Sequence, residues 1–229
     1  MKILVVGSGA REHALAMILA KDDRVESVCV NPGNSGMLNN IKVTISDKNV
    51  LDMANDFDLV VIGPEAPLAE GLTDQLQANG VNVFGPTKAA SKLESSKVFA
   101  KKIMKDAQVP TAPFSVVAHL HEAREKILNL IDETGVVVKA DGLASGKGVV
   151  VCKTLEEALL ASEELFRKYG GPLLVEKRLK GREVSALYLC LNDKFVCLGH
   201  ACDHKRLLDH DLGPNTGGMG TFSPVPWLT

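Results

Sequence analysis

Residues 7–13 (GSGAREH) form the first segment of the chain whose residue types suit phosphate binding. They follow an apolar run and open a helix-like stretch, so backbone N–H groups and the guanidinium of Arg11 would favour an anion there. The motif is not a full dinucleotide fingerprint, because Glu12 replaces the third glycine and Asn31, not an acid, ends the next strand-like run. We therefore expect a phosphate ligand other than NAD, with a plain tight turn as the alternative.

A second glycine-rich segment, residues 139–148 (KADGLASGKG), lies between two valine-rich runs. It is not a P-loop: three residues, not four, separate its first glycine from the Gly-Lys pair, and Gly148 stands where serine or threonine is needed. A strand, not a helix, is expected to follow. The pattern predicts a glycine hairpin that folds over a polyphosphate, with lysines as counter-charges. A hairpin turn without a ligand is the alternative.

Two carboxylate-bearing segments follow strand-like runs. In residues 63–68 (GPEAPL), Glu65 could receive an amine or a sugar hydroxyl, because ligands of open parallel sheets bind beyond the carboxyl ends of the strands. In residues 176–185, a strand end could offer backbone groups to an adenine edge, and Glu183 could accept hydrogen bonds from ribose hydroxyls. An exposed turn acid and a solvated charged turn are the respective alternatives.

The last part of the chain holds two further candidate segments. The glycine loop at residues 211–220 (DLGPNTGGMG) would let the backbone approach a small ligand closely. Alternation along a strand would place His200, Cys202 and His204 on one face, which invites a metal site. Their spacing fits no structural zinc pattern, so we favour a strand that leads into a loop.

The elements that must position these segments follow from apolar periodicity and from turn residues. The first 86 residues predict a parallel sheet wrapped by helices, with strands at 2–6, 25–30, 58–62 and 81–84 and helices at 11–20 and 70–78. One helix is expected over 87–105 and a proline-containing connection over 108–113. The remainder predicts an α+β region with helices at 119–131 and 154–168, strands at 136–139, 148–152, 173–177 and 183–190, and a loop-like end from 209.

Composition limits the class of partner. The 229 residues carry 26 Lys plus Arg against 28 Asp plus Glu, and aromatic residues make up 4%. A net charge of −2 gives no electrostatic reason to expect nucleic acid or a membrane surface, and few aromatics argue against base stacking. The five cysteines form no CxxC pair and several lie in apolar runs, which predicts reduced, buried thiols and a cytoplasmic protein. We read no signal peptide at the N-terminus.

Taken together, these motifs resemble one family, the glycinamide ribonucleotide synthetases (phosphoribosylamine–glycine ligases) of the ATP-grasp superfamily. The matching runs are GSGAREHAL (7–15), NPGNSG (31–36), IGPEAPL (62–68), SKVFAK (96–101), VVKADGLASGKGV (137–149), DHKR (203–206) and GPNTGGMG (213–220). The resemblance implies an α/β fold in which a parallel, Rossmann-like (pre-ATP-grasp) sheet precedes an α+β ATP-grasp region truncated at its C-terminus. The expected parts are 1–103 for the Rossmann-like domain, 104–120 for a linker and the start of ATP-grasp, 121–190 for the small lobe with the glycine hairpin, and 191–229 for an incomplete second lobe.

The resemblance also implies the reaction and the roles of residues. ATP, glycine and 5-phosphoribosylamine would give ADP, phosphate and glycinamide ribonucleotide through glycyl phosphate, in purine biosynthesis. The implied catalytic residues are Lys139, Lys147 and Asp211. The implied ATP contacts are Lys101, Lys139, Gly142, Ser145, Gly146, Lys147, Gly148, Glu176, Leu179 and Glu183. The implied substrate contacts are Gly9, Arg11, Glu12, His13, Glu65, Asn215, Thr216, Gly217, Gly218 and Met219.

The chain also departs from the family pattern. Lys177 and Arg182 stand where the family usually has acids, and Ala10 replaces a usual glycine. Family members continue beyond this length, so the resemblance implies that the ligands for Mg²⁺ follow residue 229 and that further fused domains can follow them. The isolated chain is expected to be catalytically incompetent. The alternative is a non-catalytic nucleotide- or phosphosugar-binding protein of the same fold.

Overall fold

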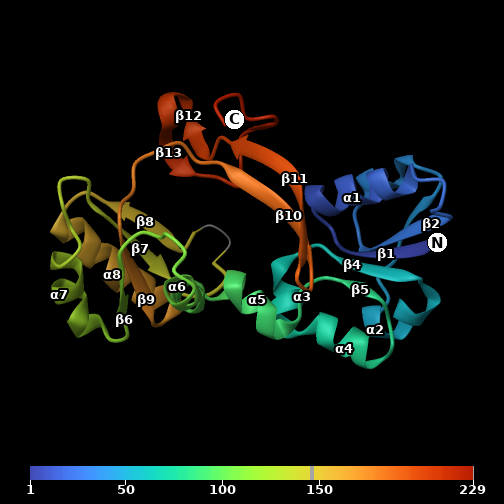
Figure 1. The fold of residues 1–229 in the computed structure, drawn as a ribbon, viewed down its shortest axis with the longest axis horizontal. Helices are drawn as coiled ribbons and strands as arrows, with labels where there is room; N and C mark the ends of the chain where they lie inside the picture. Colours follow the sequence, from blue (N-terminus) through green and yellow to red (C-terminus); the bar gives the residue numbers. More distant parts are fainter. Residues whose placement is uncertain (145–146, 229) are drawn as a thin grey trace. The chain divides into compact units, whose positions relative to one another are not determined.

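In the computed structural model, which describes residues 1–144 and 147–228, the chain divides into two units, Met1–Ile103 and Met104–Thr229 (Figure 1). Each unit has its own sheet and its own buried apolar cluster. The expected fold class, a parallel α/β unit followed by an α+β region, is confirmed.

The first unit is built on a parallel sheet with strand order β3-β2-β1-β4-β5. Along β1, Ile3 and Val5 join one buried cluster while Leu4 and Val6 join another, so both faces of the sheet are covered, as is typical of parallel sheets. The strands are β1 (Lys2–Gly7), β2 (Ser27–Pro32), β3 (Val43–Ile45), β4 (Leu59–Ile62) and β5 (Val83–Phe84). The other elements of the first unit are α1 (Ala10–Ala20), η1 (Ser35–Asn39), α2 (Val50–Met53), η2 (Ala54–Asp56), α3 (Glu65–Glu70), α4 (Leu72–Ala78), α5 (Lys88–Ser95) and the start of α6 (Lys97–Asp106), which continues into the second unit.

The first unit differs from the sequence-based expectation in three places. The single helix expected over 87–105 is two helices, because Ser96 has extended backbone angles (φ −137°, ψ 109°) and its Oγ accepts from the Phe99 N–H (3.1 Å) to start α6. The short strand β3 was not predicted. Glu65 is the first residue of a helix, α3, and not part of a turn as expected.

The second unit contains an antiparallel sheet with strand order β6-β9-β7-β8. Its strands are β6 (Phe114–Val117), β7 (Val136–Ala140), β8 (Val149–Cys152) and β9 (Leu173–Lys177), and it is packed by η3 (Leu120–Glu122), α7 (Ala123–Leu128) and α8 (Leu155–Tyr169). The predicted hairpin is confirmed, since Val136 pairs with Cys152 and Lys139 with Val149. The helix expected over 119–131 ends earlier, at Leu128, and β6 was not predicted.

The end of the second unit is more ordered than the sequence suggested. It holds β10 (Ser185–Leu191), β11 (Lys194–Asp203), β12 (Arg206–Leu208), η4 (Asp209–Asp211), β13 (Leu212–Asn215) and β14 (Thr221–Phe222). The expectation of a loop from residue 209 is therefore wrong, because β13 pairs with β12 and β14 pairs with β11.

The cysteines correct another expectation. All five are free thiols, as predicted, and Cys29 and Cys152 are buried. Cys190 and Cys197 are exposed, because they lie on β10 and β11, where each residue of β10 is exposed. An apolar strand pattern indicates the strand but not what covers it.

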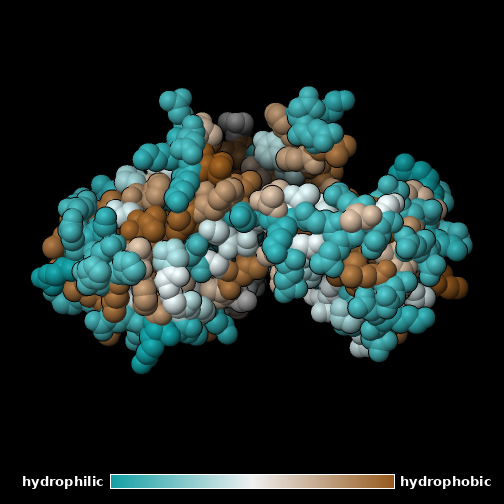
Figure 2. All heavy atoms as spheres, turned by 90° about the horizontal axis from the view of Figure 1, so that it is seen from below, coloured by the Kyte–Doolittle hydropathy of each residue, from teal (hydrophilic) through white to brown (hydrophobic). Residues whose placement is uncertain are grey.

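The surface mixes polar and apolar side chains. In Figure 2 hydrophilic residues occupy much of the face shown, with apolar patches between them. Among the described residues, no helix has both the length and the apolar character needed to cross a bilayer.

Candidate functional site

Three turns meet at the carboxyl ends of β1, β2 and β4 in the first unit. The Gly33 N–H donates to the Gly7 carbonyl (3.1 Å), and the side-chain amide of Asn34 donates to the Ser8 carbonyl (2.8 Å). The Gly63 N–H donates to the carbonyl of Val6 (3.0 Å). The motifs at 7–13, 31–36 and 63–68 are therefore brought together at the sheet edge where open parallel sheets bind ligands.

The charged side chains of these turns are linked to one another. Arg11 donates from Nε to Glu12 Oε1 (3.1 Å) and from Nη1 to Glu65 Oε1 (3.1 Å), which joins the first turn to the start of α3. The hydrogen bond from Arg11 lowers the pKa of Glu65, and the same bond raises the pKa of Arg11. The guanidinium is thus held, fully charged, between two carboxylates at the sheet edge.

The other predicted residues of this edge have distinct environments. Glu12 is buried, whereas His13 is partly buried and lies beside Gly36, whose Cβ would stand 3.8 Å from His13 Cε1. The Gly9 N–H donates to Glu12 Oε2 (2.8 Å). The sequence analysis predicted no role for the 31–36 turn. The Pro-Gly-Asn sequence at the end of a strand is the signal that could have assigned this turn to the ligand-binding edge of the sheet.

The central charged contact of the second unit joins β7 to β9. Lys139 Nζ lies 2.8 Å from Glu176 Oε1, with the lysine side chain 25% exposed and the glutamate side chain 8% exposed. Val137 is directly opposite Glu176 in the antiparallel register, so Lys139 is its diagonal neighbour on the same face. The two residues expected from separate motifs are therefore brought into direct contact.

The glycine hairpin begins where this pair lies. The Ala140 N–H donates to the Gly148 carbonyl (2.8 Å), and the Lys147 N–H donates to the Ala144 carbonyl (2.9 Å). Gly142 has φ +95° with open space around a would-be Cβ, so the backbone there turns as only glycine readily does. Lys147 is exposed, as is Leu179 after the end of β9. The expected contacts Ser145 and Gly146 lie outside the described residues.

Glu183 is paired with a residue that sequence reasoning did not select. Lys205 Nζ lies 2.8 Å from Glu183 Oε2, and this hydrogen bond raises the pKa of Lys205. The Cys202 thiol donates to the Glu183 carbonyl (3.2 Å). Lys205 belongs to the DHKR run that was quoted only for its resemblance, so the run itself was the available signal.

The 213–220 loop is attached to the same run. The Thr216 N–H donates to the Lys205 carbonyl (2.6 Å), and the Met219 N–H donates to the His204 carbonyl (2.7 Å). The Gly218 N–H in turn donates to Thr216 Oγ1 (3.0 Å). Asn215 ends β13. Of the predicted contacts in this loop, Thr216 is half-buried, and the exposed ones are Asn215, Gly217, Gly218 and Met219.

A cavity of about 350 Å³ lies beside this loop, lined by His204, Arg206, Leu207, Leu208, Asp209, His210 and Met219. The backbone of Asp211, an expected catalytic residue, belongs to the adjacent one-turn helix η4, and its side chain lies outside what is described. Residues 194–203 form the strand that we favoured over a metal site. Within residues 1–144 and 147–228 no group of three or more His, Cys, Asp or Glu side chains could hold a metal ion.

Lys177 and Arg182, the two basic residues that depart from the family pattern, each have a structural partner. Lys177 Nζ lies 2.7 Å from Asp132 Oδ2, and this hydrogen bond lowers the pKa of Asp132. The guanidinium carbon of Arg182 lies 4.9 Å from the centre of the Trp227 ring. The predicted nucleotide contact Lys101 is a buried residue of α6, in the first unit.

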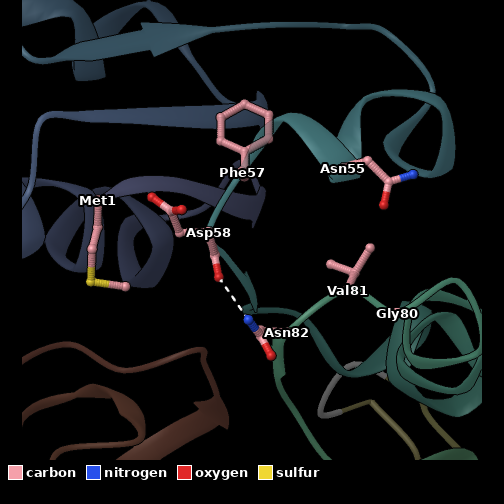
Figure 3. A pocket seen from close by; sticks show the side chains of 7 residues that line it. All are labelled: Met1, Asn55, Phe57, Asp58, Gly80, Val81 and Asn82. Atoms are coloured by element: carbon pink, nitrogen blue, oxygen red, sulfur yellow. Dashed lines mark hydrogen bonds between the residues drawn. The ribbon is translucent and has the colours of Figure 1, made fainter.

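A larger cavity, of about 500 Å³, lies at the opposite edge of the parallel sheet (Figure 3). Met1 and Asp58 contribute to it from the amino-terminal ends of β1 and β4, and the Asn82 amide donates to the Asp58 carbonyl (3.3 Å). The described residues that line it include none from the motifs above, so the cavity is separate from the turns that meet at the carboxyl edge.

The chain is similar to proteins of one family along its whole length. The family described as phosphoribosylglycinamide synthetase, N domain, matches residues 1–94, and its ATP-grasp (A) domain matches residues 95–229. The phosphoribosylamine–glycine ligase of Ralstonia nicotianae is 45% identical over 244 residues, covering 100% of this chain and 56% of that protein. The Streptococcus pneumoniae protein of the same name is 45% identical over 242 residues, with 100% and 57% covered.

Solved structures give the same picture. The crystal structure of phosphoribosylamine–glycine ligase from Thermotoga maritima matches with a TM-score of 0.84 and 36% identity, covering 98% of this chain and 56% of that one. An N5-carboxyaminoimidazole ribonucleotide synthetase in complex with ADP matches with a TM-score of 0.69 at 19% identity, over 88% of this chain and 54% of that one, which shows likeness of fold alone. The chain spans about half the length of the curated relatives that it matches.

Proposed function

The chain belongs to the phosphoribosylglycinamide synthetase family, and we propose that it supplies the first half of a carbon–nitrogen ligase that joins glycine to 5-phosphoribosylamine at the expense of ATP. The products are ADP, phosphate and glycinamide ribonucleotide, in purine biosynthesis. The observation that carries the proposal is the position of Lys139, held 2.8 Å from buried Glu176 at the base of a glycine hairpin. An ammonium group beside the backbone N–H groups of a glycine-rich segment suits the polyphosphate of a nucleoside triphosphate.

The first step transfers the γ-phosphoryl group of ATP to an oxygen of the glycine carboxylate, leaving ADP and forming an acyl phosphate. The charge on the transferred group has to be neutralised, which we assign to Lys139 and Lys147, with Lys101 as a further phosphate contact. We assign water exclusion to the hairpin at 142–148, including Ser145, Gly146 and buried Gly148, because an acyl phosphate exposed to water would hydrolyse.

The second step forms the amide bond. The ribosylamine nitrogen attacks the carbonyl carbon of glycyl phosphate, phosphate leaves, and the nitrogen loses a proton. We assign the sugar phosphate to the turn carrying Gly9, Arg11, Glu12 and His13, with Glu65 beside it. The glycine side is assigned to Asp211 and to the loop residues Asn215, Thr216, Gly217, Gly218 and Met219.

We assign the binding of the base and ribose of ATP to the end of β9 and to the segment that follows it. We assign the adenine edge to Glu176 and the backbone at Leu179, and the ribose hydroxyls to Glu183, whose side chain is 70% exposed. Mg²⁺, when bound, would supply positive charge that offsets the charge of the phosphates. The described residues offer no set of three carboxylate, histidine or cysteine ligands for it, so no step is derived through the metal.

Binding to the 229-residue chain tests both halves of the assignment. Calorimetry with ADP and, separately, with ribose 5-phosphate should give one site for each. Lys139→Met should weaken ADP at least about tenfold, the effect of losing one charge-assisted hydrogen bond, and leave ribose 5-phosphate unchanged. Arg11→Met should do the reverse. Each variant serves as the control for the other, and the assignment fails if either ligand does not bind or if Lys139→Met leaves ADP affinity unchanged.

We propose to test turnover in a protein of the relatives' full length, because the chain spans about half of that length. A hybrid in which this chain replaces the matched half of the Ralstonia nicotianae relative should release ADP only with glycine and phosphoribosylamine both present. Release of ADP without glycine would refute the proposed ligation. We place the reaction in the cytoplasm, with small molecules and neither nucleic acid nor membrane as partners.

A further inference from the structure

Glu12 was expected to contact a substrate, but its carboxylate is turned into the protein. Its side chain is 4% exposed. One oxygen, Oε2, accepts from the Gly9 N–H (2.8 Å), and the other, Oε1, accepts from Arg11 Nε (3.1 Å). A carboxylate that is bonded at both oxygens and is 4% exposed is an internal structural group, because a ligand can reach almost none of its surface.

Two glycines leave the room that this carboxylate occupies. A Cβ on Gly7, which ends β1, would stand 2.5 Å from Glu12 Cγ, and a Cβ on Gly63, which follows β4, would overlap Glu12 Oε1. Both distances are shorter than real Cβ contacts allow, so only glycine fits at either position while Glu12 keeps its place. Glu12 therefore fills the space between the turns that follow the two central strands.

Arg11 is the exposed end of the same arrangement. Its side chain is 56% exposed. Two of its nitrogen atoms donate hydrogen bonds, one to Glu12 at the start of α1 and one to Glu65 at the start of α3. A guanidinium carries five N–H donors in a fixed plane. Fixing two of them orients the rest of the plane, and donors on a plane held in this way can bind a phosphate with little loss of side-chain entropy.

We propose that Glu12 is a positioning residue for a sugar phosphate, acting through Arg11, which it holds in place at the meeting point of the 7–13 and 63–68 turns. This inference rests on the proposed function, since it assumes that Arg11 binds the phosphate of phosphoribosylamine. Glu12 itself touches no substrate. It is distinguished from an ordinary buried acid by the exposed cation that it orients.

Whether Glu12→Gln weakens or tightens the binding of ribose 5-phosphate distinguishes a positioning role of Glu12 from a purely electrostatic effect of its charge. Glu12→Gln removes a negative charge close to the phosphate, which by itself would tighten anion binding. Glutamine keeps the size of the side chain but has a single acceptor oxygen for the two N–H donors of Gly9 and Arg11. If Glu12 positions Arg11, the loss of orientation outweighs the gain in charge, and binding weakens.

The experiment is a double-mutant cycle on the affinity of the 229-residue chain for ribose 5-phosphate, measured by calorimetry. Glu12→Gln should weaken binding about tenfold in the Arg11 background and should not weaken it in the Arg11→Met background, because coupled residues are not additive. ADP affinity, measured on the same samples, should stay unchanged because we assign ADP mainly to the second unit. A thermal unfolding transition equal to that of the unmodified chain shows that the first unit, which carries Arg11 and Glu12, remains folded. Equal weakening in both backgrounds, or tighter binding by Glu12→Gln alone, would overturn the inference.

A change of shape without any change of charge provides the second test. Gly63→Ala should displace the carboxylate and weaken ribose 5-phosphate binding in the Glu12 background, with no added effect after Glu12→Ala has emptied the space. Unchanged binding by Gly63→Ala would overturn the positioning role. If the unmodified chain binds ADP but not ribose 5-phosphate, the proposed sugar-phosphate site fails and this inference fails with it, an outcome distinct from binding that ignores Glu12.

Discussion

Breaking the Lys139–Glu176 pair should destabilise the second unit more than breaking an equally short pair at the surface. At 2.8 Å and an effective dielectric constant of about 20, two unit charges attract by about 6 kcal/mol. Desolvation of the buried carboxylate cancels much of this, and the 25% exposure of the lysine reduces it further. We therefore expect a net coupling energy of about 1–2 kcal/mol between the two side chains.

The matched control is the Lys205–Glu183 pair. It has the same residue types and the same 2.8 Å separation, but its side chains are 45% and 70% exposed. Exposed pairs typically contribute less than about 1 kcal/mol, and we expect less than about 0.5 kcal/mol of coupling here. The two pairs differ in burial, and Lys205 also has Asp203 Oδ1 at 3.9 Å. Because a double-mutant cycle measures only the coupling of the two mutated side chains, the comparison still tests the effect of burial on each pair.

The assay is urea unfolding of the 229-residue chain, for Lys139→Met, Glu176→Gln and the double variant, and for Lys205→Met, Glu183→Gln and their double variant. Tryptophan fluorescence reports the second unit, because the single tryptophan, Trp227, belongs to it. The dependence of the free energy of unfolding on urea should be unchanged if the variants unfold as the parent does. Additivity at Lys139 and Glu176 within about 0.3 kcal/mol, or a larger coupling at the surface pair, would refute the argument.

Two further predictions concern the buried end of the β7–β8 hairpin. Gly135→Ala should destabilise the chain by about 3 kcal/mol or more, because a Cβ there would overlap the Cys152 carbonyl oxygen. Gly80→Ala is the control and should cost about 1 kcal/mol, because Gly80 has a similar positive φ but open space around it. Equal losses of stability in thermal unfolding would contradict the steric explanation. Burial raises the pKa of the Cys152 thiol to about 11, so alkylation at a pH of about 8 followed by mass spectrometry should label the exposed Cys190 and Cys197 well before Cys152, with the difference lost in urea.

The parallel sheet was predictable because its central strands carry their own signal. Residues 2–7 are apolar on both faces and end at a glycine, and the next strand-like runs also end at turn residues. Burial on both faces explains why these runs are continuous instead of alternating. The β7–β8 hairpin was equally visible, since a glycine-rich segment separates two valine runs.

The missed elements depend on contacts that a local pattern does not encode. Strand β3, Val43–Ile45, is three residues long and exists because it pairs with β2. The glycine- and proline-rich segment after residue 209 suggested a loop, but Leu212 pairs with Leu208 and Asn215 pairs with Arg206. In each case a neighbouring strand supplies hydrogen bonds that outweigh weak local propensity.

The candidate site shows the same division between what is local and what is not. Residue type selected Arg11 as a ligand contact, and the family resemblance selected Lys139 and Glu176, but the pairing of these residues depends on register and on distant segments. Lys139 meets Glu176 because β7 and β9 are antiparallel with Val137 opposite Glu176. A sequence without the sheet order cannot specify that diagonal contact.

Arg11, Lys139 and Lys205 already have carboxylate partners in this structure. The partners of Arg11 and Lys205 are of two kinds, because Glu12 is buried and Glu183 is exposed. Glu12, 4% exposed with both oxygens engaged, has nowhere to move, so Arg11 can bind a phosphate only while remaining attached to it. Glu183 is 70% exposed and can rotate away from Lys205 into solvent at little cost. A phosphate at Arg11 would therefore be added while Glu12 stays in place. At Glu183 the ribose hydroxyls would compete with Lys205 for the carboxylate, so affinity there is a difference between two partners of one acid. The buried carboxylate contributes by fixing the geometry of a cation, whereas the exposed one contributes as a ligand itself.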